Sequence, residues 1–174
     1  LAARVPSAPA AMPDFPLQPY PRTIEKCYRD ILFHGPEMRF IRSVEGCSQS
    51  GIVVHAAQAL PPKNWMRQPW RDAWLSDPAA LDAAFQAMIL WTCEKLGAAS
   101  LPSLGARYRQ YRKMPDSGCV IRAKATKRAD GVAGADVDFL DHSGLVAARL
   151  EGYECTVDKS LSEVFRRNTM VVGG

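Results

Sequence analysis

The most regular hydrophobic pattern in the chain lies between Asp77 and Gly97, where apolar residues fall on almost every side of a helix. Such a pattern is typical of a helix that is buried on all its faces. Asp77 can accept hydrogen bonds from the free amides of the first turn, and Pro78 fits the first helical position, which needs no N–H donor. Lys95 suits the last turn, and Gly97 suits the left-handed residue that ends a helix. The sequence therefore predicts a long central helix with both ends specified.

Two polar side chains, Asp82 and Gln86, interrupt this apolar helix. They are four residues apart, so they share a face and can touch. Burial favours the protonated form of a carboxyl group, and a buried aspartic acid held by an amide can act as a general acid. The pair could also be structural, with the carboxylate accepting hydrogen bonds from the backbone of a neighbouring loop. On spacing alone, the structural interpretation is the better supported one.

Shorter alternating and β-branched segments predict strands on both sides of the central helix. These segments cover residues 40–45, 52–57, 120–127, 135–140 and 145–155. The first two form a hairpin, and the last three form an antiparallel meander joined by turns. Residues 101–105 contain proline and glycine and are typical of a turn. Thr23 can cap a short helix over residues 24–32, and residues 160–165 can form another.

A helix that is apolar all round needs a sheet wrapped around it. One curved antiparallel sheet around one central helix is the hotdog arrangement, so the predicted fold class is α+β. We assign residues 23–158 to this domain, residues 1–22 to a Pro- and Ala-rich linker arm, and residues 159–174 to a C-terminal tail.

The composition fits one soluble domain with tails, since the 174 residues are 47% hydrophobic and 23% charged. The formal net charge of +4 comes from scattered Lys and Arg, so no nucleic-acid partner is indicated, although the charge would steer an acidic protein surface. No run of about 18 apolar residues occurs, so no membrane span is predicted. The chain begins at Leu1 without a signal-peptide pattern, and we expect it to be a piece of a longer polypeptide.

The cysteines and histidines predict no metal site. Five widely spaced cysteines form no C-x-x-C pair, so we expect free thiols in a reducing compartment, the cytoplasm. The three histidines, His34, His55 and His142, lack metal-ligand spacing. We expect His142 to be solvated in a turn and His34 to cap a helix end, whereas His55 could face a pocket. The absence of G-x-S-x-G, P-loop and G-x-G-x-x-G motifs leaves hydrolase chemistry and nucleotide binding unsupported.

Three stretches, in their order and spacing, resemble the C-terminal half of a polyketide synthase dehydratase domain and the dehydratases of polyunsaturated fatty acid synthases. They are L-F-H-G-P at residues 32–36, D-P-A-A-L-D-A-A-F-Q at residues 77–86, and L-P at residues 101–102. The D-x-x-x-Q element formed by Asp82 and Gln86 is the most specific part. The resemblance covers about residues 23–158.

The resemblance implies a double hotdog whose second half carries the catalytic Asp. In that family Asp82 would protonate the departing β-hydroxyl group, and Gln86 would hold it. The first half would supply a His that removes the proton next to the thioester carbonyl, leaving a trans-enoyl product. The substrate would be an acyl chain on the phosphopantetheine arm of an acyl carrier protein, with no cofactor bound directly. Phe85, Leu101 and Pro102 would contact this substrate.

Acyl carrier proteins are acidic, so the resemblance also implies a basic docking surface. Arg107, Arg109, Arg112 and Lys113 could form such a surface. The same residues could simply be the solvated edge of a strand. Both interpretations remain open.

The chain departs from the full family pattern because none of its histidines has Gly four residues later. The family's H-x-x-x-G-x-x-x-x-P motif is therefore absent, and we expect this half to be inactive alone, since losing one proton-transfer group costs roughly 10²–10⁴-fold in rate. It would need an N-terminal hotdog half, in cis or from another chain, and an isolated hotdog could also pair as a homodimer. Two other interpretations are a non-catalytic hotdog that serves docking or structure, and half of a product-template cyclase, which shares the D-x-x-x-Q element.

Overall fold

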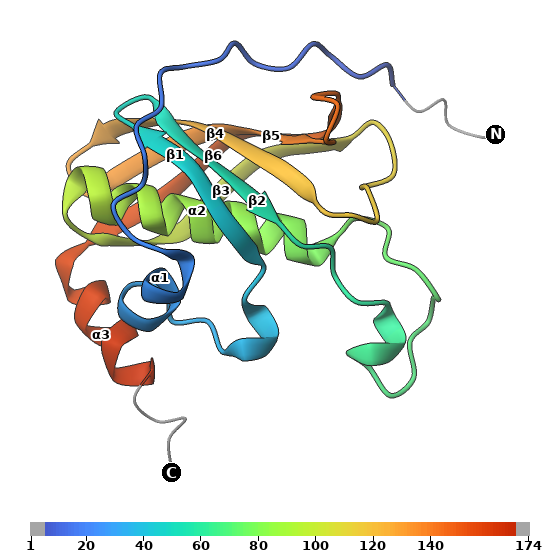
Figure 1. The fold of residues 1–174 in the computed structure, drawn as a ribbon, viewed down its shortest axis with the longest axis horizontal. Helices are drawn as coiled ribbons and strands as arrows, with labels where there is room; N and C mark the ends of the chain where they lie inside the picture. Colours follow the sequence, from blue (N-terminus) through green and yellow to red (C-terminus); the bar gives the residue numbers. More distant parts are fainter. Residues whose placement is uncertain (1–5, 170–174) are drawn as a thin grey trace.

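A six-stranded antiparallel sheet covers one side of the long helix α2 (Pro78–Leu96), as the computed structural model of residues 6–169 shows (Figure 1). The strand order is β1-β2-β4-β5-β6-β3. The remaining elements are α1 (Ile24–Asp30), η1 (Pro36–Met38), β1 (Ile41–Ser48), β2 (Gly51–Ala56), η2 (Pro62–Asn64), β3 (Ala99–Gln110), β4 (Cys119–Ala129), β5 (Val132–Leu140), β6 (Val146–Asp158) and α3 (Lys159–Thr169). This arrangement is the predicted α+β hotdog fold.

The ends of α2 follow the sequence prediction. The carboxylate of Asp77 accepts hydrogen bonds from the backbone amides of Ala79 and Ala80, over 2.8 and 3.2 Å. It also accepts from the backbone amide of Ala59 and so ties the helix start to the chain that follows β2. At the other end, Gly97 adopts a left-handed conformation with φ of 70°. Both ends of the helix therefore lie where the capping residues Asp77 and Gly97 predict.

The core lies between α2 and the inner face of the sheet. Its largest fully buried side chains include Trp91 and Met88 from the helix and Ile121 and Phe139 from the strands. The indole N–H of Trp91 donates to the backbone carbonyl of Ser48 over 2.9 Å, which links the helix to the β1–β2 hairpin. The alternating burial predicted for β4 is confirmed, because its inward-facing residues Ile121, Ala123 and Ala125 are buried.

The prediction of a turn at residues 101–105 is wrong. These residues lie inside strand β3, which pairs with β6 at one edge of the sheet. Proline is compatible with an edge strand because one side of the strand needs no backbone N–H, and the ladder shifts register between Pro102 and Leu104. The turn between β1 and β2 is also shorter than predicted, because β1 continues to Ser48.

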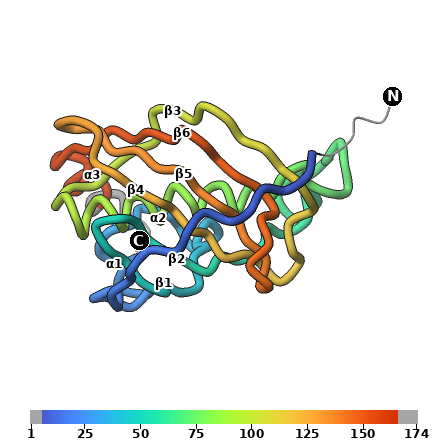
Figure 2. The backbone as a smooth tube through the Cα atoms, turned by 90° about the horizontal axis from the view of Figure 1, so that it is seen from above, coloured from blue at the N-terminus to red at the C-terminus, as the bar shows by residue number. Residues whose placement is uncertain are grey.

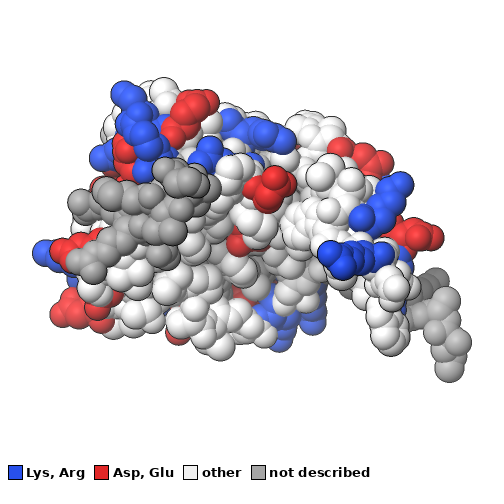
Figure 3. Space-filling model, turned by 90° about the horizontal axis from the view of Figure 1, so that it is seen from below, with Lys and Arg blue, Asp and Glu red and all other residues white. Residues whose placement is uncertain are grey.

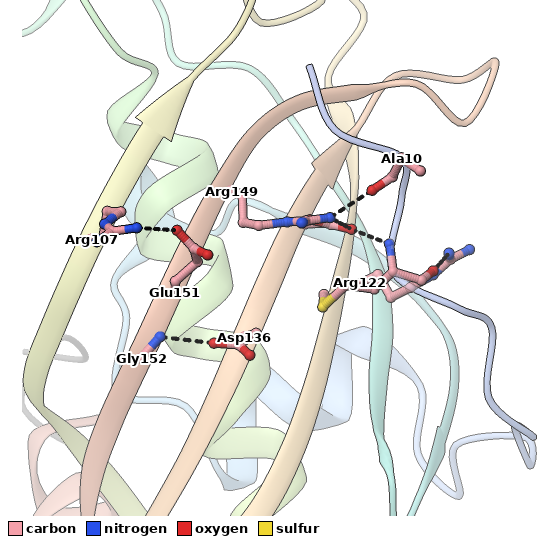
Figure 4. Close-up of polar contacts among 9 residues, drawn as sticks. Ala10, Arg107, Arg122, Asp136, Arg149, Glu151 and Gly152 are labelled. Atoms are coloured by element: carbon pink, nitrogen blue, oxygen red, sulfur yellow. Dashed lines mark hydrogen bonds and ion pairs between the residues drawn. The ribbon is translucent and has the colours of Figure 1, made fainter. Parts of the chain in front are cut away.

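The segment before α1 crosses the sheet on the face that points away from α2 (Figure 2). Three side-chain groups of the sheet bind its backbone. Asp138, which is fully buried, accepts from the amide of Met12 over 2.7 Å. Arg122 donates to the carbonyl of Met12 over 3.0 Å, and Arg149 donates to the carbonyl of Ala10 over 2.9 Å (Figure 4). Residues 1–5 of the predicted arm and 170–174 of the predicted tail lie outside the described residues.

The described part of the chain has no helix that is long and apolar enough to cross a membrane. All five cysteines are free. Residues 159–169 of the predicted C-terminal tail form α3, which follows β6 directly and carries the buried Phe165.

Candidate functional site

Asp82 and Gln86 touch, as their spacing predicts. The amide Nε2 of Gln86 donates to Oδ2 of Asp82 over 2.5 Å. Gln86 is fully buried, but the side chain of Asp82 is 26% exposed, so the prediction that both are buried holds for Gln86 only. Leu81 and Phe85 are also half-buried and lie on the same side of α2 as Asp82. The sheet covers the other side of the helix.

Three neighbours fix the orientation of the Gln86 amide. The backbone amide of Ile41 donates to the hydroxyl of Tyr28 over 2.8 Å, so this hydroxyl can use its proton to donate to Oε1 of Gln86 over 2.7 Å. Burial raises the pKa of Tyr28, so the phenol keeps that proton. Nε2 of Gln86 donates to the carbonyl of Met38 over 2.8 Å. Since a carbonyl only accepts, the amide group cannot be flipped, and its second N–H must point at Asp82.

This network distinguishes the two oxygens of Asp82. Oδ2 receives the Gln86 N–H and therefore acts as an acceptor. No hydrogen bond within residues 6–169 engages Oδ1. When the carboxyl group is protonated, Oδ1 is the oxygen that is free to carry and donate the proton. The arrangement is chemically that of an oriented general acid, and it is equally compatible with a carboxylate that accepts hydrogen bonds at Oδ1.

His34 lies beside the same carboxyl group, which corrects its predicted role as a helix cap. Helix α1 ends at Asp30, and Nε2 of His34 is 3.7 Å from Oδ2 of Asp82. The His34 ring stacks on that of Phe33, with centroids 4.3 Å apart. Burial lowers the pKa of His34, while the charge of Asp82 acts in the opposite direction. Sequence reasoning did not assign His34 to the site, although it belongs to the L-F-H-G-P stretch that carries the family resemblance.

Two of the three residues predicted to contact substrate line one hollow, whereas Asp82 and Gln86 do not line it. The hollow has a volume of about 450 Å³ and an apolar wall. Its lining residues are Leu81, Phe85, Pro102, Ser103, Leu104, Gly105, Tyr108, Leu150 and Tyr153. Leu101 is not among them and is 37% exposed on β3. The hollow therefore lies between the partly exposed side of α2 and the edge strand β3.

The predicted basic surface is partly neutralised. Arg107 lies 3.7 Å from Glu151 (Figure 4), and Arg112 lies 3.6 Å from Asp141. Lys113 pairs with Asp116 over 2.7 Å. In the described structure only Arg109 of this group has no acidic partner within ion-pair distance. Elsewhere, the face seen from below carries Lys and Arg that are spread among Asp and Glu (Figure 3).

The other histidines do not join the site. His55 is partly exposed on β2 and lies 3.3 Å from Glu45. It lines a shallow hollow together with His142, which is exposed in the turn before β6. Within residues 6–169 no three His, Cys, Asp or Glu side chains are grouped so that they could hold a metal ion.

Comparison with known families matches residues 3–160 to the family described as “Polyketide synthase dehydratase N-terminal domain”. Among curated proteins, one of the subunits of the polyunsaturated fatty acid synthase of Thraustochytrium sp. (strain ATCC 26185 / S-3) is 40% identical over 85 residues. That match covers 48% of this chain and 3% of the synthase polypeptide.

Two examples of solved structures with a similar fold are both dehydratase domains. The dehydratase domain of RzxB from Pseudomonas fluorescens has a TM-score of 0.64 at 18% identity, covering 85% of this chain and 54% of that one. The dehydratase domain of PpsC from Mycobacterium tuberculosis, in complex with C12:1-CoA, has a TM-score of 0.62 at 18% identity, covering 87% and 56%. The chain thus spans about half the length of each, and at this identity the likeness concerns the fold.

Proposed function

This chain belongs to the polyketide synthase dehydratase family, and we propose that it is the half of such a domain that carries the general acid. Its reaction would be the removal of water from a β-hydroxyacyl thioester. The single observation that carries this proposal is the oriented carboxyl group of Asp82, whose Oδ2 is held by Gln86 and whose Oδ1 has no hydrogen-bond partner among the described residues. The experiment that tests the proposal replaces this carboxyl group by an amide, in the variant Asp82→Asn.

The assignment to the C-terminal half rests on the residues. The matched family description speaks of an N-terminal domain, but the chain carries D-x-x-x-Q on α2 and has no His followed by Gly four residues later. These observations support a hotdog that supplies the acid and relies on another for the base.

The proposed chemistry assigns one step to this chain. Oδ1 of Asp82 donates its proton to the β-hydroxyl group as the bond between carbon and that oxygen breaks, and water leaves. The His of the other half takes the proton from the α-carbon, and the electron pair of that C–H bond forms the new double bond. Gln86 keeps Oδ2 engaged, so the proton stays on the oxygen that faces the substrate.

The hollow lined by Leu81 and Phe85 supports an acyl substrate. Leu81 directly precedes Asp82 in α2. The wall is apolar, which suits a hydrocarbon chain better than a polar metabolite. The related PpsC domain was solved with C12:1-CoA, an acyl thioester. We therefore place the acyl chain against Phe85 and Pro102, with the thioester carried by the phosphopantetheine arm of an acyl carrier protein.

The edge strand β3 is the proposed contact with the half that bears the catalytic His. In the described structure β3 has one neighbouring strand, β6. Its residues 101–107 are all exposed, including Leu104 at 50%. An exposed edge of this kind readily pairs with another strand. Pairing there would also cover the hollow, which is lined by Pro102, Leu104 and Tyr108 of β3. A second copy of this chain could occupy the same edge when the other half is missing.

The carrier protein would approach the same region. Arg109 lies on β3 and belongs to the predicted basic surface. Within residues 6–169, no acidic group lies within ion-pair distance of it. Arg107 and Arg112 are weakly paired and exposed, so an acidic carrier could compete for them. This part of the proposal predicts that raising the salt concentration slows turnover of carrier-bound substrate more than turnover of a free pantetheine thioester.

The test uses the polypeptide that contains this segment together with its His-bearing half. Asp82→Asn should lower the dehydration rate of a β-hydroxyacyl pantetheine thioester by about 10²–10⁴-fold, because the donor proton is lost. Asp116→Asn is the matched control, because it removes an exposed carboxylate that is outside helix α2. This variant should leave the rate unchanged. Normal turnover by Asp82→Asn would show that the carboxyl group is structural. Conversion of an aromatic poly-β-ketone instead of the β-hydroxyacyl thioester would favour a cyclase.

A further inference from the structure

We propose that His34 is a positioning residue for Asp82, and that helix α3 holds it in place through a stack of aromatic rings. This inference rests on the proposed function, because it concerns how the acid of that function is oriented. The proposal gives a role to His34 and to helix α3, neither of which takes part in the proposed reaction itself.

Three contacts in series connect α3 to the carboxyl group. The rings of Phe165 and Phe33 lie 4.3 Å apart between centroids. The rings of Phe33 and His34 also lie 4.3 Å apart and are stacked, at an angle of 26°. Nε2 of His34 then lies 3.7 Å from Oδ2 of Asp82. Phe165 is 5% exposed, so the first ring of the series is anchored in the core.

Packing, and not hydrogen bonding, sets the orientation of the His34 ring. Its Nδ1 is buried and has no hydrogen-bond partner within residues 6–169. Without a polar partner on that side, the ring is kept in place by the face of Phe33. A smaller side chain at position 33 or 165 would therefore let the imidazole move, and a shift of about 1 Å in a catalytic arrangement can cost on the order of 10²-fold in rate.

His34 and Gln86 approach the same oxygen of Asp82 from different elements. Gln86 lies one turn along α2, whereas His34 comes from the segment between α1 and η1. Both contacts are made to Oδ2, so Oδ1 is left without a hydrogen-bond partner among the described residues. Among the described titratable groups, Asp82 is the one whose charge acts on His34. The protonation of His34 therefore reports on the charge of the Asp82 carboxyl group.

The first measurement is independent of activity. Carbon-13 labelled histidine in the complete domain allows the imidazole of His34 to be titrated by NMR. Asp82→Asn should move the His34 midpoint to lower pH, because the carboxylate that favours its charged form is gone. Asp116→Asn removes a carboxylate that is not among the charges acting on His34, so it should leave the midpoint in place. An unchanged midpoint in Asp82→Asn would overturn the proposed coupling, whether or not that variant still dehydrates substrate.

The second measurement tests the stack. Phe165→Ala should lower kcat by about 10²-fold with little change in KM, and should also shift the His34 midpoint. Phe165→Leu keeps an apolar side chain and should recover most of the rate, and it serves as the readout if Phe165→Ala does not fold. Val164→Ala, an exposed neighbour on the same helix, is the control. If a folded Phe165 variant matches Val164→Ala in both kcat and His34 midpoint, α3 does not position the site and the proposal is wrong.

Discussion

The hydroxyl of Tyr28 donates to the amide oxygen of Gln86 over 2.7 Å, so a residue of α1 determines which end of that amide faces Asp82. Tyr28 and Gln86 lie 58 positions apart in the sequence, and both are buried. The orientation of the acid is therefore decided by a contact between two helices. This relationship makes the polar network a determinant of both stability and chemistry.

Replacing Gln86 should destabilise the fold. Gln86→Leu leaves the hydroxyl of Tyr28 and the carbonyl of Met38 without their present partner inside the protein. A buried polar group that loses its partner costs roughly 1–3 kcal/mol. Urea unfolding should therefore show a loss of at least about 1 kcal/mol. Gln58→Leu is the control, because its hydrogen bond to Asp116 is exposed, and it should change stability by less than about 0.5 kcal/mol. Equal stability of the two variants would contradict the network.

Breaking the buried ion pair on the outer face of the sheet should cost more. Arg149 binds the carboxylate of Asp138, which is fully buried. Arg149→Met leaves that carboxylate without its counter-charge, and such a loss typically costs about 3–5 kcal/mol. Urea unfolding measures it.

The control for this prediction is Arg107→Met, since Arg107 is exposed and only loosely paired with Glu151. Exposed pairs of this kind contribute about 0–1 kcal/mol. Adding Asp138→Leu to Arg149→Met should restore part of the lost stability, because it removes the uncompensated charge. A double variant that is less stable than Arg149→Met alone would argue that another contact of Asp138 dominates.

Stability should fall as the pH is lowered through the range where free histidine takes up a proton. Burial lowers the pKa of His34 from its ordinary value of 6.5. Below that value the unfolded chain binds a proton that the folded chain does not, so protonation favours unfolding. The contribution of His34 is therefore present above pH 6.5 and is lost as the pH falls towards its folded pKa. Chemical denaturation in steps between about pH 5 and 7.5 measures the slope. His34→Phe should flatten it, and an equal slope in both proteins would contradict the buried neutral state.

Two glycines with the same backbone conformation should respond differently to alanine. Gly118 and Gly144 have φ of 89° and 82°, so each alanine variant bears the roughly 1–2 kcal/mol strain of a left-handed residue. Only at Gly118 would the added Cβ lie 2.1 Å from the backbone carbonyl oxygen of Ala56. Around Gly144 nothing lies within 4 Å. Thermal unfolding should therefore show a clearly lower Tm for Gly118→Ala than for Gly144→Ala.

The sequence was most informative where one element carries its own signals. The bounds of α2 followed from Asp77, Pro78 and Gly97, because capping acts over one turn. Strand β4 followed from alternation, since one of its faces is buried and the other is not. Strand β3 escaped prediction because both of its faces are exposed along residues 101–107, which removes the alternating pattern, and because Pro102 suggests a turn.

The site could be predicted only in part for the same reason. Asp82 and Gln86 are neighbours on one helix, so their contact followed from their spacing. His34 and Tyr28 reach them from a different part of the chain, far earlier in the sequence, and no local pattern reports such a contact. The partial exposure of Asp82 depends on which face of α2 the sheet covers, and this is a property of the whole fold.

The segment that crosses the outer face of the sheet is held by hydrogen bonds to its main chain. Asp138, Arg122 and Arg149 bind the amide of Met12, its carbonyl and the carbonyl of Ala10, all of which every amino acid except proline possesses. Substitutions in this segment can therefore accumulate without changing the path that the chain follows. The three sheet side chains could therefore bind a different segment at this place, provided that its residue at position 12 keeps an N–H group.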